Sequence, residues 1–137
     1  MNLLLDTGVI IALLDRRERR HEQCVRLCRD SPAQLVTCEA AVVEACHLLR
    51  HIHGAPQAVV ANVEAGIFRI PCRLADRGSA VRELMKKYAD VPMSLADACL
   101  VDLATQLGTG RILTLDSDFR VYRWGRNRPF EMLIELD

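Results

Sequence analysis

The chain has 137 residues, half of them hydrophobic, which is the size of one ordinary globular domain with its own core. Eighteen basic and eighteen acidic side chains balance, so no overall charge attracts the protein to nucleic acid or to a membrane, and any such attraction must be local. The sequence has no secretion signal and no run of about 18 apolar residues. We therefore expect one soluble, cytoplasmic domain over residues 1–137, without membrane contact.

Strand-like and helix-like stretches alternate along the whole chain. In chain order, the patterns predict a strand over 2–5, helices over 7–15 and 19–30, a strand over 34–37, a helix that Thr37 caps and that runs to His53, a helix over 56–66, a strand over 67–70, helices over 74–89 and 95–108, and strands over 111–116 and 131–136. This alternation predicts an α/β sandwich around a mostly parallel sheet.

Six cysteines lie within apolar helical patterns, which favours reduced core residues over a disulfide framework. Cys24 and Cys28 are one helical turn apart and are a possible metal pair. No second pair at ligand spacing completes a tetrahedral site, so the structural interpretation is preferred.

Acidic residues stand where strands end or inside apolar stretches. Asp6 follows the first strand and Asp116 ends the strand over 111–116, and ligands of parallel sheets bind beyond such carboxyl ends. Asp97 lies in the first turn of a helix, and Glu44 interrupts an apolar helical stretch, which we expect to turn it inward. Carboxylates that converge repel each other unless a cation lies between them, and oxygen ligands favour Mg²⁺ or Mn²⁺.

Simpler interpretations exist for several of these residues. Asp97 is a possible helix-capping residue, and Asp116 and Asp118 are possible turn residues. The run Asp6-Thr7-Gly8 matches the aspartic-protease signature, but a helix follows at once where that fold has β-structure. The Glu-x-x-His spelling that begins at Glu44 occurs once, whereas di-iron bundles use two copies.

Four short motifs together resemble those of PIN-domain ribonucleases, in the order typical of that family. They are the run from Leu3 to Thr7, the helical pair Val43-Glu44, the run from Ser94 to Ala98 and the run from Leu113 to Phe119. The likeness is strongest to VapC-type toxins of prokaryotic toxin–antitoxin modules and includes the tail from Phe119 to Arg128.

The resemblance implies a three-layer α/β/α fold and an endoribonuclease site that depends on Mg²⁺ or Mn²⁺. Its acids correspond here to Asp6, Glu44, Asp97 and Asp116, with Asp118 as a possible accessory; Glu39 is a less suitable alternative to Glu44. Asp6, Asp97 and Asp116 would hold metal, and Glu44 would bind it through water or act as a base. The hydroxyls that orient such acids correspond to Thr7 and Thr114.

RNA that reaches an acidic pocket needs cations beside it. One arginine cluster includes Arg16 and Arg17, and a second includes Arg120 and Arg123, interleaved with Tyr122 and Trp124, whose rings would stack on bases. The resemblance implies tRNA, rRNA or mRNA as the substrate. It also implies a VapB-type antitoxin lying along the helices over 7–15 and 40–53, and a homodimer.

Two other functions stay open. One is a PIN-like RNA-binding module without turnover, although such a module has no reason to keep four acids together. The other is a phosphohydrolase or receiver domain with Asp6 as the nucleophile. Such a domain needs a lysine after a late strand, whereas Lys86 and Lys87, the only lysines, lie in a predicted helix.

Overall fold

A computed structural model describes residues 1–137 and shows a five-stranded parallel sheet. Its strands are β1 (Asn2–Leu5), β2 (Gln34–Val36), β3 (Phe68–Arg69), β4 (Arg111–Leu113) and β7 (Glu131–Met132), in the spatial order β3-β2-β1-β4-β7. The central strand β1 is parallel to both neighbours, and its Leu4 lies opposite Val36 on one side and Ile112 on the other. The carboxyl ends of β1 and β4 therefore lie side by side.

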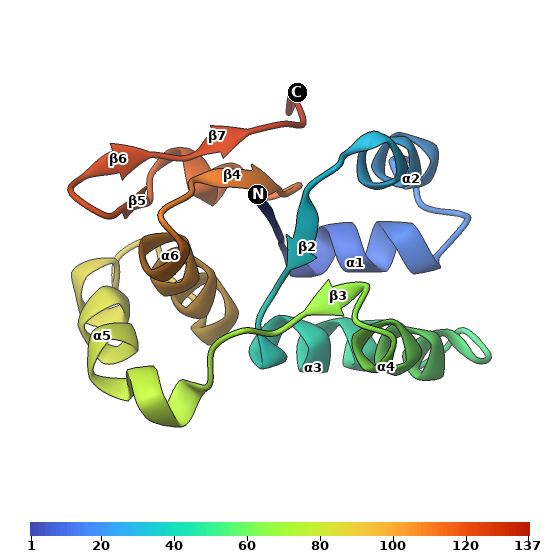
Figure 1. Ribbon diagram of the computed structural model, residues 1–137, viewed down its shortest axis with the longest axis horizontal. Coiled ribbons are helices and arrows are strands. Elements are labelled where there is room, and N and C mark those ends of the chain that lie inside the picture. The colour runs from blue at the N-terminus through green and yellow to red at the C-terminus, as the bar shows by residue number, and fades with distance from the viewer.

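Helices cover both faces of this sheet, as expected for an α/β/α sandwich (Figure 1). In that view α5 (Leu74–Lys87) and α6 (Leu95–Leu107) lie to the left, whereas α1 (Thr7–Leu14), α2 (His21–Asp30) and α4 (Ala55–Glu64) lie to the right. Helix α3 (Glu39–Leu48) contacts α1, α4 and α6. The 3₁₀ helix η1 (Ser117–Arg120) precedes a small antiparallel hairpin of β5 (Arg123–Trp124) and β6 (Arg128–Pro129). None of the helices combines the length and apolar character that a membrane span requires.

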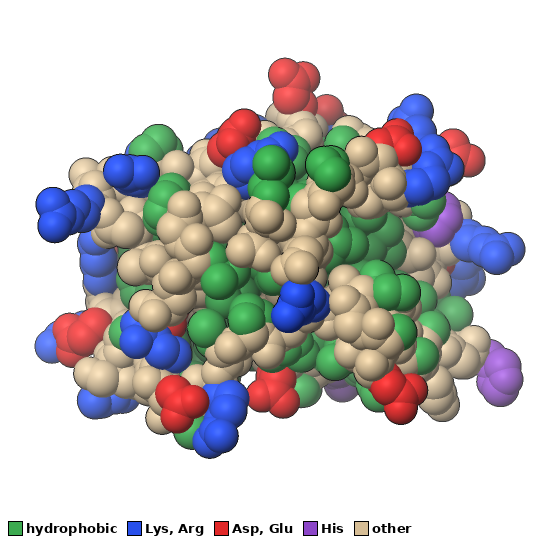
Figure 2. All heavy atoms as spheres, in the orientation of Figure 1, with side chains coloured by type: hydrophobic (Ala, Val, Ile, Leu, Met, Phe, Trp, Pro, Cys, Tyr) green, Lys and Arg blue, Asp and Glu red, His purple; other side chains and the backbone are tan.

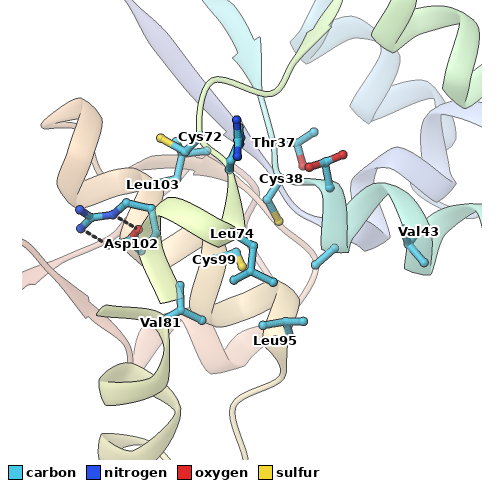
Figure 3. A pocket seen from close by; sticks show the side chains of 14 residues that line it. Thr37, Cys38, Val43, Cys72, Leu74, Val81, Leu95, Cys99, Asp102 and Leu103 are labelled. Atoms are coloured by element: carbon cyan, nitrogen blue, oxygen red, sulfur yellow. Dashed lines mark hydrogen bonds and ion pairs between the residues drawn. The ribbon is translucent and has the colours of Figure 1, made fainter. Parts of the chain in front are cut away.

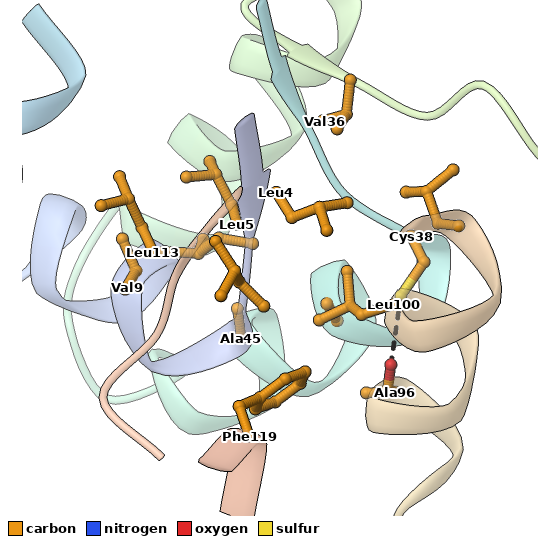
Figure 4. Close-up of a cluster of buried hydrophobic side chains, with 14 of the residues drawn as sticks. Leu4, Leu5, Val9, Val36, Cys38, Ala45, Ala96, Leu100, Leu113 and Phe119 are labelled. Atoms are coloured by element: carbon orange, nitrogen blue, oxygen red, sulfur yellow. Dashed lines mark hydrogen bonds between the residues drawn. The ribbon is translucent and has the colours of Figure 1, made fainter. Parts of the chain in front are cut away.

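The position of β1 in the centre of the sheet accounts for its apolar sequence. Leu3, Leu4 and Leu5 are almost fully buried because helices cover both faces of the sheet, and this gives a continuous apolar run rather than an alternating one. Figure 4 shows Leu4 and Leu5 among apolar side chains from the other layers, including Val9 of α1, Leu100 of α6 and Phe119 of η1. The six cysteines are free thiols, as predicted, and Cys24 and Cys38 are buried.

One helix and three strands differ most clearly from the prediction. Helix α3 begins at Glu39 with Cys38 as its N-cap, because the Thr37 hydroxyl donates to the carbonyl of Leu5 (2.9 Å) and not to a helix end. It ends at Leu48, and turns follow as far as Gly54. Strands β3, β4 and β7 are shorter than predicted, and the hairpin of β5 and β6 was not predicted at all.

Candidate metal centre

Three aspartates from three separate elements meet at the carboxyl end of the sheet. Asp6 follows β1, Asp116 lies three residues beyond the end of β4, and Asp97 is in the first turn of α6. One carboxylate oxygen of each lies within 4.8 Å of those of the other two. Asp6 and Asp97 are only 5% and 8% exposed, and Asp116 is half-buried. The structure thus brings together three of the four acids named from the sequence.

Local hydrogen bonds explain why each aspartate has its place. Asp6 is the N-cap of α1 and accepts from the backbone N–H of Thr7 (2.8 Å). Asp116 is the N-cap of η1 and accepts from the N–H of Asp118 (2.9 Å). In α6 the cap is Ser94, whose hydroxyl accepts from the N–H of Asp97 (3.1 Å). The Asp97 carboxylate is therefore not needed as the helix cap.

Thr114 joins two of the acids across the sheet. Its hydroxyl donates to Oδ2 of Asp6 (2.7 Å) and accepts from the backbone N–H of Asp116 (3.0 Å). Thr114 is fully buried, so both hydrogen bonds of its hydroxyl are protected from competition with water. Thr114 therefore fixes the orientation of the Asp6 carboxylate relative to the backbone that carries Asp116.

The three acids are electrostatically unfavourable as a set. Burial raises the pKa of Asp6 from 3.8 to about 6, against the lowering effect of the hydrogen bonds from Thr114 and Thr7. Asp97 and Asp116 raise that pKa further through their negative charge. Burial also raises the pKa of Asp97, and the charge of Asp116 adds to that increase. A cation between the carboxylates would relieve both the repulsion and the lost solvation.

The donor set fits a hard divalent ion. Its ligand atoms are all carboxylate oxygens, the type that Mg²⁺ and Mn²⁺ prefer. Thr7 lines the same pocket, but its buried hydroxyl has no hydrogen-bond partner within the protein, so the expectation that this hydroxyl orients an acid is wrong and only the Thr7 backbone N–H contacts Asp6. An unpaired buried hydroxyl costs roughly 1–3 kcal/mol, and a water molecule on a bound ion would satisfy it.

Two further acids lie at the edge of this centre. Glu44 and Asp118 line the same pocket, of about 420 Å³, but are outside the cluster of three. Our expectation that Glu44 turns inward is wrong, because Glu44 is exposed. Ala41 and Ala45 form the buried face of α3, which places Glu44 toward solvent at the pocket mouth. Glu39 instead lines a different cavity.

The sequence of this chain matches a known protein family. The family model described as PIN domain matches residues 3–125. This chain belongs to the PIN-domain family. It is 34% identical over 118 residues to ribonuclease VapC26 of Mycobacterium tuberculosis (strain ATCC 25618 / H37Rv), a match that covers 83% of this chain and 86% of that protein. The family predicted from the four short motifs is confirmed.

A solved structure confirms the PIN-like fold. The crystal structure of Mycobacterium tuberculosis VapC20, described as a toxin that cleaves the sarcin–ricin loop, superposes with a TM-score of 0.80. The match covers 93% of this chain and 99% of that one at 24% sequence identity. At this identity the likeness supports the three-layer fold and the mostly parallel sheet, and the residue roles must come from the site itself.

The arginines named as RNA ligands lie outside the acidic pocket of this PIN domain. Figure 2 shows Lys and Arg side chains distributed over one face, with most of them toward its left and right sides. Arg16 and Arg17 are exposed, and Nε of Arg17 lies 3.5 Å from Oδ1 of Asp15. Arg120 donates to the carbonyl of Leu136 (3.2 Å). The Nη1 atom of Arg123 donates to three backbone carbonyls around the end of η1, so this side chain also stabilises the turn.

The two aromatic residues between those arginines have different surroundings. Tyr122 is fully buried and its hydroxyl donates to Oδ2 of Asp97 (2.9 Å), so the prediction that it stacks on RNA bases is wrong. Burial and the Asp97 carboxylate raise the pKa of Tyr122 far above its usual value, which keeps the phenol protonated as a donor. The contact with Asp97 was missed, although the helical spacing of Phe119 and Tyr122 indicates a shared inward face.

Trp124 packs against Gly110, the residue directly before β4. A Cβ atom at Gly110 would lie 2.0 Å from the indole nitrogen, so this close approach requires glycine. The indole N–H donates to the carbonyl of Pro129 (3.1 Å), and the Arg128 guanidinium lies 5.4 Å from the ring centroid. A base that stacks on this half-buried ring must first displace Arg128.

A separate apolar cavity of about 310 Å³ lies between α3, α5 and α6 (Figure 3). Leu74, Val81 and Leu95 line it, and Arg77 at its edge makes two hydrogen bonds of 2.9 Å to the buried carboxylate of Asp102. None of the three clustered aspartates lines this cavity. The ion pair satisfies Asp102 and makes it a structural acid, unlike those of the metal centre.

Proposed function

We propose that this PIN domain is a metal-dependent endoribonuclease that hydrolyses RNA phosphodiester bonds as the toxin of a VapBC-type toxin–antitoxin module. The observation that carries the proposal is the cluster of Asp6, Asp97 and Asp116, whose carboxylates lie within 4.8 Å of one another in a PIN domain. The relative that is 34% identical is named a ribonuclease, which supports the same activity here.

In this proposal Asp6, Asp97 and Asp116 hold one Mg²⁺ or Mn²⁺ ion or a pair of ions. When bound, such an ion polarises the scissile phosphate and makes a nearby water more acidic. Glu44 at the pocket mouth is exposed and accepts the proton of the attacking water, directly or through a second water. The water oxygen bonds to phosphorus as the bond from phosphorus to the leaving ribose oxygen breaks, and that oxygen takes up a proton from solvent. Thr114 and the backbone N–H of Thr7 orient the Asp6 carboxylate. Asp118 is an accessory acid whose pKa is raised by burial and by Asp116.

Exposed arginines neutralise the RNA backbone beside the acidic pocket in the same proposal. Arg16, Arg17 and Arg120 are the most accessible of the named set, whereas Arg123 and Trp124 are partly engaged in the turn and hairpin. Phosphate contacts of this kind make binding weaker as the salt concentration rises. The substrate is tRNA, rRNA or mRNA.

A VapB-type antitoxin is the proposed protein partner. Helices α1 and α3 pack together, and Ile11 and Leu48 line the acidic pocket beside Glu44. Val43 and Leu48 of α3 are 68% and 43% exposed, which offers an apolar surface next to the acids. An antitoxin arginine can pair with two carboxylates and occupy the metal position. A homodimer and a cytoplasmic location complete the proposal.

Purified protein incubated with tRNA, rRNA and a sarcin–ricin loop oligonucleotide tests the activity. We expect internal cleavage with Mn²⁺ or Mg²⁺, none with a chelator, and none from the Asp6→Asn/Asp116→Asn double variant. Cleavage that the double variant retains would refute the proposed site, and absence of cleavage in every condition would refute the nuclease.

Expression in cells tests the toxin role separately. Expression of the chain alone should arrest growth, and co-expression of the antitoxin encoded by the neighbouring gene should restore it through a stable complex. Harmless accumulation of the wild-type protein would refute the toxin role and leave the nuclease assay as an independent result.

A further inference from the structure

Tyr122 reaches the metal centre from inside the core. Its ring is fully buried, with edge-to-face contacts at centroid distances of 5.1 Å to both Tyr88 and Phe119. Rings held on two sides in this way have little rotational freedom, so the position of the hydroxyl is fixed by packing. That hydroxyl donates to Oδ2 of Asp97 at 2.9 Å.

Asp97 is not part of the hydrogen-bond link that Thr114 makes between the other two aspartates. Asp6 and the backbone of Asp116 are linked through the Thr114 hydroxyl, but Asp97 stands on α6, on a different element from that pair. Tyr122 follows η1, the 3₁₀ helix that Asp116 caps, and its N–H donates to the carbonyl of Asp118 (3.2 Å). The phenol therefore connects the segment that carries Asp116 to the carboxylate on α6.

The hydrogen bond also distinguishes the two oxygens of Asp97. Because Oδ2 accepts from the phenol, rotation of the carboxylate about its Cβ–Cγ bond is restricted, and Oδ1 is left free of that donor. Hydrogen bonds of this kind behind a ligand change metal affinity by about 10-fold to 100-fold when they are removed.

We propose that Tyr122 is a positioning residue that holds the Asp97 carboxylate in the orientation required to bind the divalent ion, without itself touching ion or RNA. The inference rests on the metal centre of the proposed function and adds a residue to it. It also gives the aromatic cluster of Tyr88, Phe119 and Tyr122 a role in the site as well as in the core.

Tyr122→Phe tests this inference, with Tyr88→Phe as the matched control. Each variant removes one hydroxyl from the same aromatic cluster and so breaks one hydrogen bond. The Tyr88 hydroxyl accepts from the backbone N–H of Arg123 (3.0 Å) and not from an acid. Similar losses of melting temperature are expected for the two variants, whereas only one of them changes a contact of the metal centre.

The first measurement is Mn²⁺ binding to each purified protein without RNA. Electron paramagnetic resonance of the free ion gives the concentration of unbound Mn²⁺. We expect Tyr122→Phe to weaken Mn²⁺ binding by about 10-fold and Tyr88→Phe to change it by less than about twofold. The second is RNA cleavage against Mn²⁺ concentration, where Tyr122→Phe should need about 10-fold more Mn²⁺ but regain most of the maximal rate at saturation.

The possible outcomes separate this inference from the proposed function. Wild-type-like Mn²⁺ binding by Tyr122→Phe, or equal weakening in both variants, overturns the positioning role. If the wild type binds Mn²⁺ but cleaves no RNA, the proposed nuclease fails, while the comparison of Mn²⁺ affinities still decides the role of Tyr122. If the wild type binds no Mn²⁺, both are overturned.

Discussion

Replacement of Asp6 by asparagine should stabilise the metal-free protein at neutral pH. The folded-state pKa of Asp6 is about 6, compared with 3.8 when the group is unperturbed. Because the folded state binds the proton more tightly, the contribution of Asp6 to stability is fully present below about pH 4 and is lost as the pH rises through about 6. The difference between 3.8 and about 6 corresponds to about 3 kcal/mol lost at neutral pH.

The introduced amide is uncharged and avoids this loss. Its oxygen can still accept from the N–H of Thr7, but its NH₂ group cannot accept from the Thr114 hydroxyl, which costs about 1 kcal/mol. The expected net gain at pH 7.5 is therefore about 2 kcal/mol. For a chain of this length that gain corresponds to an increase in melting temperature of roughly 6–8 °C.

Chemical denaturation in a chelating buffer between pH 4.5 and 7.5 measures the free energy of unfolding of the wild type and of Asp6→Asn. The free energy of unfolding of the wild type minus that of Asp6→Asn should fall by about 2 kcal/mol across this range, because part of the loss of about 3 kcal/mol has already occurred at pH 4.5 and the comparison cancels most other titrating groups. With saturating Mn²⁺ the order should reverse, since only the wild type binds the ion strongly. A difference that does not change with pH, or a variant less stable than metal-free wild type at pH 7.5, would refute the electrostatic argument.

Three other substitutions have expected outcomes that differ in kind. Asp97→Asn should reduce RNA cleavage at least 100-fold but change unfolding free energy by no more than about 1 kcal/mol, because Ser94 caps α6; parental cleavage rates would remove Asp97 from the site. Thr114→Val should cost about 2–3 kcal/mol in denaturant titrations and weaken Mn²⁺ binding, since two hydrogen bonds are lost; unchanged stability would contradict this. Asp102→Ala should lower the melting temperature, because two hydrogen bonds to Arg77 are lost, with an unchanged cleavage rate per folded molecule; loss of cleavage in the folded variant would contradict a purely structural role.

The parts of the fold that the sequence predicts well are those with strong local patterns. The buried run Leu3–Leu5 identifies β1, and a carboxylate immediately after it places Asp6 at the carboxyl end of the sheet. Ser94 is the N-cap of α6 in the structure, as predicted from its spacing to Asp97. For these elements, side-chain period and capping chemistry are decided within a few residues.

The remaining features depend on contacts between distant segments. The orientation of Glu44 follows from which face of α3 packs against the rest of the protein, and the apolar residues on both sides of Glu44 do not identify that face. The bond between Tyr122 and Asp97 joins residues 25 positions apart, so the spacing of Phe119 and Tyr122 can indicate an inward face but not the partner that Tyr122 meets there. The hairpin of β5 and β6 has strands of only two residues, which is too short for an alternating pattern to be detected.

The position of Mn²⁺ in crystals of the wild-type protein, located by its anomalous scattering, tests the metal centre most directly. We expect a peak that carboxylate oxygens of Asp6, Asp97 and Asp116 coordinate directly, and no peak at this place in crystals of Asp6→Asn/Asp116→Asn. A wild-type peak elsewhere in the molecule, or no bound ion at a saturating concentration, would contradict it.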